Sequence, residues 1–263
     1  MKRNLILLLL IFYCSKNFSQ NKIYLDENII EIDSLEFIKK CKFKVFKCLV
    51  YKTDSIIINK VLNKYNFGKI KKKEYHQIRK LLIKNQNRLI DSSSALLINY
   101  RDSLYDFITR KKNFENHVKK HDSVKHVSFS FKKFDSNRKR WIKKQKKCIK
   151  KVKRKHNAET FYVYNFDFGS IKDYPDLNWI KDIGVFKRVF FSVMYESSFL
   201  ILKPNGNYFL SGGHLGDKML KKLIRTENWT NFIKDLKTSK KNKNTRGVGF
   251  FNNNLIHNKS HCF

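Results

Sequence analysis

The apolar residues of the chain recur with two different periods, and each period predicts its own type of element. Over residues 43–51, lysines alternate with apolar residues, which is the period of two typical of a strand with one buried face. Over residues 137–156, a second set of residues recurs at spacings of four and three, which predicts a long helix with a narrow apolar stripe and basic residues on every other face. This stripe consists of Trp141, Gln145, Cys148 and Val152.

Shorter apolar segments predict the remaining elements. Strands are expected over residues 22–32 (a strand or hairpin), 56–62, 95–100, 127–131 and 160–166, and residues 189–195 are a further apolar segment. Helices are expected over residues 34–40, 73–85, 104–121 and 217–236. Ser34 and Asp217 are the expected N-caps of the first and last of these helices. Strands and helices therefore alternate along the chain, which predicts an α/β fold, with α+β as the alternative.

The sharpest local pattern is a hairpin over residues 198–211. Two apolar segments flank Pro204, Asn205 and Gly206. The Asn-Gly pair accepts the positive φ values that tight hairpin turns require. We therefore expect two antiparallel strands joined at this turn.

The N-terminus has the three parts of a secretory signal. Lys2 and Arg3 form a positive head, residues 5–12 are an unbroken apolar core, and a polar stretch ending in Ser19 and Gln20 follows. The apolar core is shorter than the roughly 20 residues that span a bilayer. We therefore expect cleavage after Ser19 or Gln20 and an exported mature chain, periplasmic or secreted, without a transmembrane span.

Cys14 supplies an alternative for this segment, a lipid anchor. Bacterial lipoproteins need a small residue immediately before the modified cysteine, and the bulky Tyr13 occupies that position. The sequence therefore favours cleavage over lipidation, and also over retention of the segment as an anchor helix.

The chain is strongly basic, with a net charge of +35 at pH 7. Because residues 1–19 carry three positive charges and no acid, cleavage after Ser19 leaves a net charge of +32. Such a charge attracts polyanions, for example an anionic envelope surface or an acidic polysaccharide. Lysine makes up 46 of the 57 basic residues, and the AT-rich codons of Lys, Asn, Ile and Phe offer compositional drift as the alternative explanation. Nucleic acid is a disfavoured partner, because export removes it from reach and its readers rely on arginine.

The densest positive charge lies in the predicted long helix, where residues 138–156 hold twelve Lys and Arg and no acid. A basic amphipathic helix can lie on an anionic surface or follow a phosphate backbone. Its apolar stripe suits packing on a sheet equally well, and both can hold together. The candidate polyanion-binding residues are Arg138, Arg140, Lys143, Lys147, Lys150, Lys151 and Arg154.

Four cysteines follow the signal segment, and an even number in an exported chain is compatible with disulfides. Cys41 and Cys48 are close in sequence and form the candidate pair, although buried free thiols are the alternative. No two cysteines have the Cys-x-x-Cys spacing, so standard dithiol redox chemistry and tetracysteine zinc sites lack support.

Two stretches of the chain resemble envelope thioredoxins. Residues 96–108 (LLINYRDSLYDFI) resemble the strand that leads into the active site, and residues 199–213 (FLILKPNGNYFLSGG) resemble the closing hairpin. The resemblance implies a thioredoxin-like mixed sheet flanked by helices, in which segments 96–100, 160–166 and 199–211 share one sheet. The expected domains are a signal peptide at 1–19, an α/β extension at 20–89, a thioredoxin-like domain at 90–236 and a flexible polar tail at 237–263.

The thiol chemistry of that family is absent from this sequence. Tyr105 and Ile108 stand at the two positions where the family has its cysteines, and Ser197 and Ser198 stand near its cis-proline. The resemblance therefore implies the fold without the redox activity. The chain is also similar to uncharacterised exported proteins of AT-rich Gram-negative bacteria, which implies a compartment and no activity.

Two further motifs suggest a metal or anion site. His117 and His121 have the spacing that lets two histidines on a helix share a metal, and His126 follows, but five nearby lysines would repel a cation. Residues 212–217 (GGHLGD) could hold an anion on backbone N–H groups, although a turn and a helix cap explain them better. We therefore assign no catalytic residue, no metal and no cofactor.

Three functions remain as hypotheses. The leading one is a non-enzymatic, basic binding or structural protein of the cell envelope. The alternatives are a thiol-disulfide redox protein that uses Cys41 and Cys48, and a polyanion-binding module centred on the basic helix.

Overall fold

The computed structural model describes residues 21–120, 129–191, 197–212, 215–241, 245–252 and 262. These residues form two compact units. The first comprises residues 21–41 and 48–62, and the second comprises residues 42–47 and the described residues from Asn63 onward. Each unit has its own sheet, so the expected mixed α/β class is confirmed.

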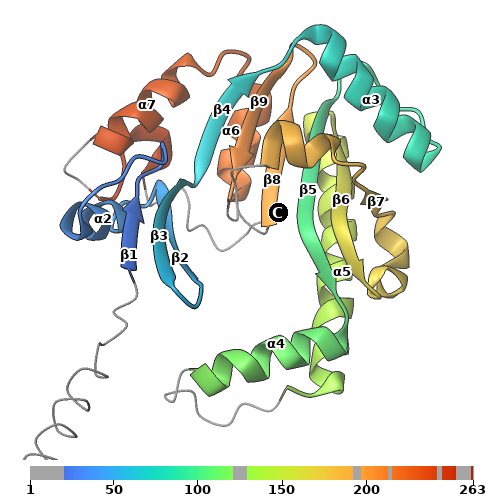
Figure 1. Ribbon diagram of the computed structural model, residues 1–263. Coiled ribbons are helices and arrows are strands. Elements are labelled where there is room, and N and C mark those ends of the chain that lie inside the picture. The colour runs from blue at the N-terminus through green and yellow to red at the C-terminus, as the bar shows by residue number, and fades with distance from the viewer. Residues whose placement is uncertain are drawn as a thin grey trace, which may run out of the picture. The chain divides into compact units, whose positions relative to one another are not determined.

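The first unit is a three-stranded sheet with one helix (Figure 1). Its elements are β1 (Asn21–Leu25), α2 (Ser34–Cys41), β2 (Phe46–Lys52) and β3 (Ile56–Asn63). The strand order is β1-β3-β2, and β1 runs parallel to β3. The prediction that Ser34 caps α2 is wrong, because the Asp33 carboxylate accepts the hydrogen bond from the Glu36 N–H at 2.8 Å. Asp33 is therefore the residue that satisfies the first free donors of this helix.

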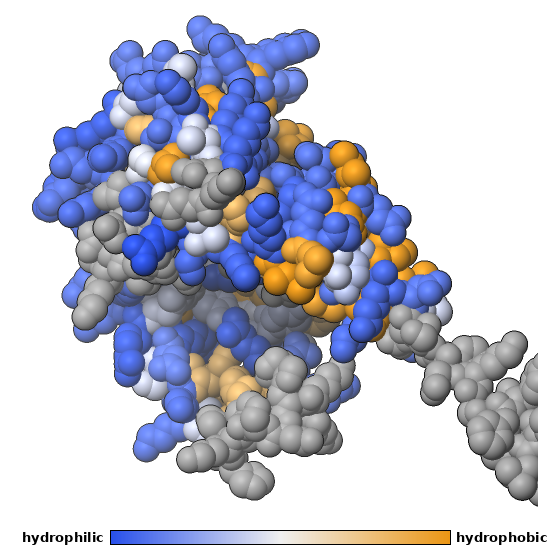
Figure 2. Space-filling view, turned by 90° about the vertical axis from the view of Figure 1, so that its left-hand side faces the viewer, coloured by the Kyte–Doolittle hydropathy of each residue, from blue (hydrophilic) through white to orange (hydrophobic). Residues whose placement is uncertain are grey.

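The surface of the first unit includes several apolar side chains. The face in Figure 2 is mostly hydrophilic and is interrupted by groups of apolar residues. The exposed large apolar residues of the first unit are Ile29, Ile30, Leu35, Ile38, Val50 and Tyr51. A sheet of three short strands covered by one helix of eight residues is too small to bury all of its apolar side chains.

The second unit holds a six-stranded sheet. Its strands are β4 (Tyr65–Lys69), β5 (Ala95–Tyr105), β6 (Ala158–Phe168), β7 (Ile180–Lys181), β8 (Ser197–Leu202) and β9 (Asn207–Ser211). Its α-helices are α3 (Lys72–Gln86), α4 (Phe107–Lys120), α5 (Phe131–His156), α6 (Asp217–Arg225) and α7 (Thr230–Lys241). Short helical turns cover Ile171–Asp173, Pro175–Leu177, Lys187–Phe191 and Gly249–Phe251.

The order of this sheet is β4-β9-β8-β5-β6-β7. β5 and β6 are parallel and joined by the crossover that contains α4 and α5, whereas β8 is antiparallel to both β5 and β9. Segments 96–100, 160–166 and 199–211 therefore share one sheet, as expected. The expected mixed sheet flanked by helices is confirmed, while membership of the thioredoxin family stays a prediction.

Helices cover both faces of this sheet. Because alternate residues of a strand point to opposite sides, neighbouring residues of one strand join different cores. In β6, Phe161 and Val163 join the main core, together with the inward residues of α3. Tyr162, between them, packs instead with Ile142 of α5, and its hydroxyl donates a hydrogen bond to Gln145 at 2.8 Å. The predicted helix over 137–156 is thus confirmed, and its stripe lies on the sheet.

The predicted hairpin over 198–211 is confirmed, with a difference at the turn. Gly206 has a φ of 84°, but Asn205 does not have positive φ. Instead, the Asn205 side chain accepts a hydrogen bond from the Asn207 N–H at 3.0 Å. One glycine in the left-handed region is therefore enough to turn this chain.

Several boundaries differ from those expected. The second unit begins near Asn63 rather than at residue 90, because β4 pairs with β9 and α3 supplies core residues. The expected closing helix over 217–236 is two helices, α6 and α7, and Gly216 rather than Asp217 is the N-cap of α6. Within the expected tail at 237–263, α7 continues to Lys241, and Phe250, Phe251 and Cys262 are buried.

One expected strand and one unassigned apolar segment are not extended where they are described. The strand over 127–131 does not form at its described end, because Ser130 caps α5, which begins at Phe131. Within the apolar segment 189–195, residues up to Phe191 belong to a π-helical turn, and the rest lie outside the described residues. In the part of the chain that the structure describes, no helix has the length and apolarity needed to cross a bilayer.

Candidate functional site

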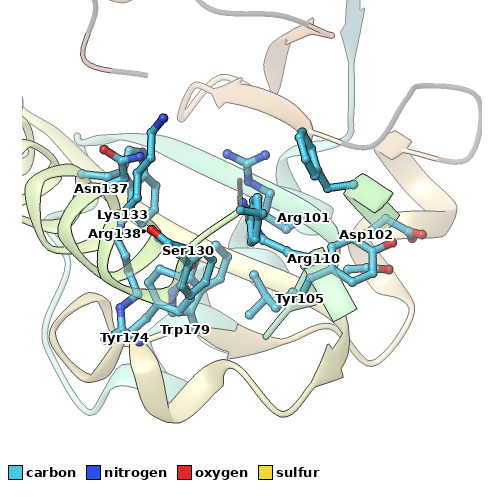
Figure 3. A pocket seen from close by; sticks show the side chains of 16 residues that line it. Arg101, Asp102, Tyr105, Arg110, Ser130, Lys133, Asn137, Arg138, Tyr174 and Trp179 are labelled. Carbon is cyan, nitrogen blue, oxygen red and sulfur yellow. Dashed lines mark hydrogen bonds between the residues drawn. The ribbon is translucent and has the colours of Figure 1, made fainter. Parts of the chain in front are cut away.

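A cavity of about 590 Å³ opens at the C-terminal end of β5 (Figure 3). The last five residues of β5, 101–105, line it together with side chains from α4, from the start of α5 and from the segment before β7. The parallel strands β5 and β6 end side by side here, with Tyr105 paired to Phe168. Ligand sites of sheets with parallel strands form outside such carboxyl ends, because the connecting segments diverge there.

Aromatic side chains form much of the cavity wall. Its aromatic residues are Tyr105, Phe114, Phe129, Phe134, Trp141, Tyr174 and Trp179. Phe114 and Phe129 lie 5.4 Å apart between ring centroids, and Trp141 meets Tyr174 edge to face at 5.8 Å. Because aromatic rings combine large contact area with few rotatable bonds, they provide a firm surface for an apolar or ring-shaped group.

Four cationic side chains surround this aromatic wall: Arg101, Arg110, Lys133 and Arg138. The guanidinium of Arg110 lies over the ring of Phe134, 5.8 Å from its centroid. In Figure 3 the charged ends of Arg101 and Lys133 reach toward the same side of the cavity. The cavity therefore combines positive charge with apolar surface.

Two of the charged groups at the cavity are compensated locally. Asp102 pairs with Lys187 and accepts a hydrogen bond from the Asn165 amide at 3.2 Å. Arg138 pairs with Asp173 at 2.7 Å and also with Asp135. Partial burial disfavours the charged form of Arg138, but these two carboxylates raise its pKa above the ordinary value.

Arg110 and Lys133 are cavity cations without such compensation. Neither pairs with an acidic side chain among the residues that the structure describes, and both are exposed. Among the described residues, the cavity therefore carries an excess of positive charge that a ligand anion would balance.

Of the positions at which the thioredoxin resemblance placed the active site, Tyr105 lies at this cavity. Tyr105 lines it, and Ile108, in the first turn of α4, is exposed. β8 begins at Ser197, which pairs with Arg101 of the cavity, and Ser198 pairs with Tyr100. None of the described peptide bonds is cis. The position that the resemblance assigns to the first cysteine is thus occupied by a tyrosine of the cavity wall.

The seven predicted polyanion-binding residues all lie on α5 but separate into groups. Arg138 faces the cavity and its acidic partners, and Lys151 pairs with Asp217 at 2.8 Å. The others are exposed and pair with no acidic side chain of the described chain: Arg140, Lys143, Lys147, Lys150 and Arg154. Most of the predicted residues therefore lie along one helix without an acidic partner in the described chain.

The four cysteines that follow the signal segment form two disulfides. Cys41 is joined to Cys48 in the first unit, as the sequence suggested. Cys148 of α5 is joined to Cys262, and both of these residues are buried. None of these four cysteines lines the cavity.

The histidine motif lies largely outside the described residues. His121 and His126 are not described, and of His117 only its place in α4 is known. The 212–217 segment is described only in part, and Asp217 there accepts a hydrogen bond from the Cys262 N–H at 3.1 Å and pairs with Lys151. Among the described residues, no group of His, Cys, Asp and Glu is arranged to hold a metal ion.

The cavity itself was not predicted from the sequence, because its walls come from separate segments. The available signal was the density of aromatic residues at the start of α5 and before β7, where Phe129, Phe131, Phe134, Tyr174 and Trp179 lie. The local alternation around Phe129 predicts a strand there instead, and so does not reveal a cavity wall.

Comparison with known proteins gave no relative of this chain. No family model matches it, and no match was found among curated proteins or solved structures. The function must therefore be argued from the residues of the site.

Proposed function

We propose that this chain is an exported, non-enzymatic binding protein whose site is the cavity at the end of β5. The ligand is a small anion that carries an apolar or ring-shaped part. The observation that supports this proposal is the combination of the uncompensated cations Arg110 and Lys133 with an aromatic wall. Such a site attracts an anion and also favours burial of an attached apolar group.

The geometry supports binding better than catalysis. Among the described lining residues the carboxylate is Asp102, which is occupied by Lys187 and Asn165 and so is poorly placed to act as a base. The described lining also has no cysteine and no histidine that could act as a nucleophile or proton carrier. The proposal therefore assigns no catalytic residue and needs no cofactor.

The redox alternative rests on Cys41 and Cys48. Their disulfide lies in the first unit, whereas the cavity lies in the second, and the other disulfide is buried. A redox active site needs an accessible sulfur beside a substrate-binding surface. These cysteines fit a structural role better, so redox activity is the second candidate.

Export is part of the proposal and rests on the N-terminal sequence. Lys2, Arg3 and the apolar core supply the signal, and cleavage after Ser19 or Gln20 releases the mature chain. A periplasmic or secreted protein with this cavity would meet small anions of the cell exterior.

The experiment is a titration of the mature protein with 8-anilinonaphthalene-1-sulfonate, an aromatic sulfonate, followed by the fluorescence of the dye. Replacing Lys133 or Arg110 with glutamine should weaken binding about fivefold each, which corresponds to about 1 kcal/mol. Lys132→Gln and Lys112→Gln are the matched controls, because these exposed residues are neighbours in sequence but do not line the cavity.

Equal affinities in all four variants would overturn the proposal, because the dye would then be bound elsewhere. Competition by unlabelled aromatic carboxylates, and none by uncharged analogues of equal size, is the second expected result. An uncharged analogue that competes equally well would contradict the role of the cations.

A further inference from the structure

Four cationic side chains follow one line along the exposed face of α5, and we call them the basic stripe: Lys143, Lys147, Lys150 and Arg154. Their spacings of four, three and four residues place them on one side of the helix. At a rise of about 1.5 Å per residue, the stripe is about 16 Å long. Neighbouring members begin about 5–6 Å apart at their Cβ atoms.

The acids near α5 do not neutralise the basic stripe. Asp176 pairs with Lys146 at 2.9 Å, Asp217 with Lys151 at 2.8 Å and Glu159 with Lys153 at 2.8 Å. These ion pairs lie beside the stripe. No member of the stripe pairs with an acidic side chain in the described parts of the chain. Its positive charge is therefore available to a ligand.

A shallow groove of about 350 Å³ runs beside the first three members of the stripe. It is lined by Lys139, Ile142, Lys143, Lys146, Lys147, Lys150 and Asp176. Ile142 lies at the bottom of this groove and is almost completely buried, while the lysines around Ile142 are exposed. A groove with a small apolar floor and cationic edges can hold a flexible chain whose charges point outward to both sides.

The side chains on this face distinguish between classes of polyanion. Proteins that bind single-stranded nucleic acid stack its bases on aromatic rings, and no large apolar or aromatic side chain of residues 138–156 is exposed. Helices that lie in a membrane surface bury apolar side chains between lipids, but the apolar stripe of α5 packs on the sheet. Three of the four members are lysines, which act as point charges and need no planar partner.

We propose that the basic stripe binds an acidic polysaccharide through the carboxylate or sulfate groups that repeat along its chain. The line of four cations matches a linear ligand with regularly spaced charge, and the groove accommodates its uncharged sugar rings. This site is separate from the cavity, because Arg110 and Lys133 are not part of the stripe. The two sites therefore make independent predictions.

The experiment measures binding of the mature protein to heparin, a sulfated polysaccharide, and to polygalacturonate over a range of salt concentrations. The stripe variant carries Lys143→Glu, Lys147→Glu, Lys150→Glu and Arg154→Glu. The control variant carries Lys72→Glu, Lys73→Glu, Lys80→Glu and Lys84→Glu, four exposed residues of α3. Both variants change the net charge by the same amount.

The stripe variant should bind both polysaccharides at least about tenfold more weakly at physiological salt, and the control should lose much less. Equal losses in the two variants would overturn the proposal, because diffuse charge would then explain the binding. Stripe-dependent binding that is tighter to a single-stranded oligonucleotide or to anionic phosphatidylglycerol vesicles would overturn the assignment to polysaccharide. A milder variant has the same four positions changed to glutamine. If this variant binds weakly while its circular dichroism spectrum matches that of the natural protein, the loss of binding does not result from loss of folding.

Discussion

Tyr105 stacks on Phe168, with ring centroids 5.2 Å apart and ring planes inclined by 19°. The two residues are paired neighbours at the ends of the parallel strands β5 and β6. Tyr105 also lines the cavity, at a position where the thioredoxin resemblance would place a reactive cysteine. The stacked pair therefore joins the ends of the two parallel strands, and through Tyr105 it supports the wall of the proposed binding site.

This contact predicts a measurable coupling between the two residues. Stacked aromatic pairs contribute about 0.5–1.5 kcal/mol beyond their buried area. Tyr105→Leu and Phe168→Leu should each destabilise the protein, and the double variant should be less destabilised than the sum of the two by about 1 kcal/mol. Urea denaturation of the four proteins checks this double-mutant cycle. Strictly additive losses would mean that the stacking contributes nothing.

The hairpin turn predicts a second result, at Gly206. Its φ of 84° strains any residue with a Cβ, and a Cβ there would also overlap the carbonyl oxygen of Ile70. Gly184 has a similar φ of 89°, but the nearest atom to its Cβ position is 3.9 Å away. Gly184→Ala should therefore cost about 1 kcal/mol of stability from backbone strain alone, and Gly206→Ala at least about 2 kcal/mol. Equal losses in thermal and urea denaturation would contradict the overlap.

The buried amine of Lys203 predicts a pH dependence of stability. The amine lies 4.6 Å from the ring centroid of Trp229 and donates a hydrogen bond to the Thr226 carbonyl. Burial lowers its pKa to about 8, although Glu227 acts in the opposite direction. Between pH 8 and the ordinary lysine pKa of 10.5, the unfolded chain binds the proton that the folded chain has lost, so the stability should rise with pH.

Lys203→Met is the variant that tests this assignment. The variant has no titrating amine at this position. As the pH rises from about 7.5 to about 9.8, the free energy of unfolding of the natural protein should therefore increase relative to that of the variant. Buried tyrosines limit the range, because burial raises the pKa of Tyr65 and Tyr162 and so weakens folding above about pH 10. A constant difference across this range would contradict a lowered pKa for Lys203.

Local patterns predicted much of the fold. β5 and β6 stand out as short apolar segments, α5 carries a helical period, and Gly206 marks the hairpin turn. β4 was missed, because its five residues are held by pairing with β9, which lies far along the chain. Phe129 and Phe131 alternate with polar residues as a strand would, yet both pack around Phe107 at the start of a helix. Tertiary contacts overrode the local period there.

The two candidate sites differ in how far the sequence could predict them. The basic stripe lies within one helix, so helical spacing alone brings Lys143, Lys147, Lys150 and Arg154 together. The cavity depends on a crossover that places α4 and α5 at the end of β5, and no local pattern contains that information. The basic stripe could therefore be predicted from the sequence, whereas the cavity could not.

The two disulfides should differ in their contribution to stability. Cys148 and Cys262 are separated by 114 residues, whereas Cys41 and Cys48 are separated by 7. In the loop-entropy description, a longer closed loop stabilises more, by about 4–5 kcal/mol for about 100 residues and by about 2–3 kcal/mol for a short loop. Replacing Cys148 and Cys262 with serine should therefore lower the urea midpoint more than the same change at Cys41 and Cys48. The reverse order would show that native-state effects at the short loop dominate.

Processing of the N-terminal segment predicts a change in the number of free thiols. The full chain has five cysteines, and the two disulfides use all except Cys14. Export with cleavage after Ser19 or Gln20 should therefore remove this unpaired cysteine and leave a mature chain that reacts with maleimide only after reduction. Mass spectrometry of the protein exported by a Gram-negative host, before and after maleimide treatment, measures both the cleavage site and the thiol count.

The side chain that precedes Cys14 supplies the control for this experiment. Because lipoprotein processing needs a small residue at that position, Tyr13→Ala should increase lipidation of Cys14 in the same host, while the natural chain should carry no lipid. The variant thus shows that the host could have attached a lipid to this segment. A natural chain recovered with lipid on Cys14, or with its first 19 residues intact, would contradict export by simple cleavage.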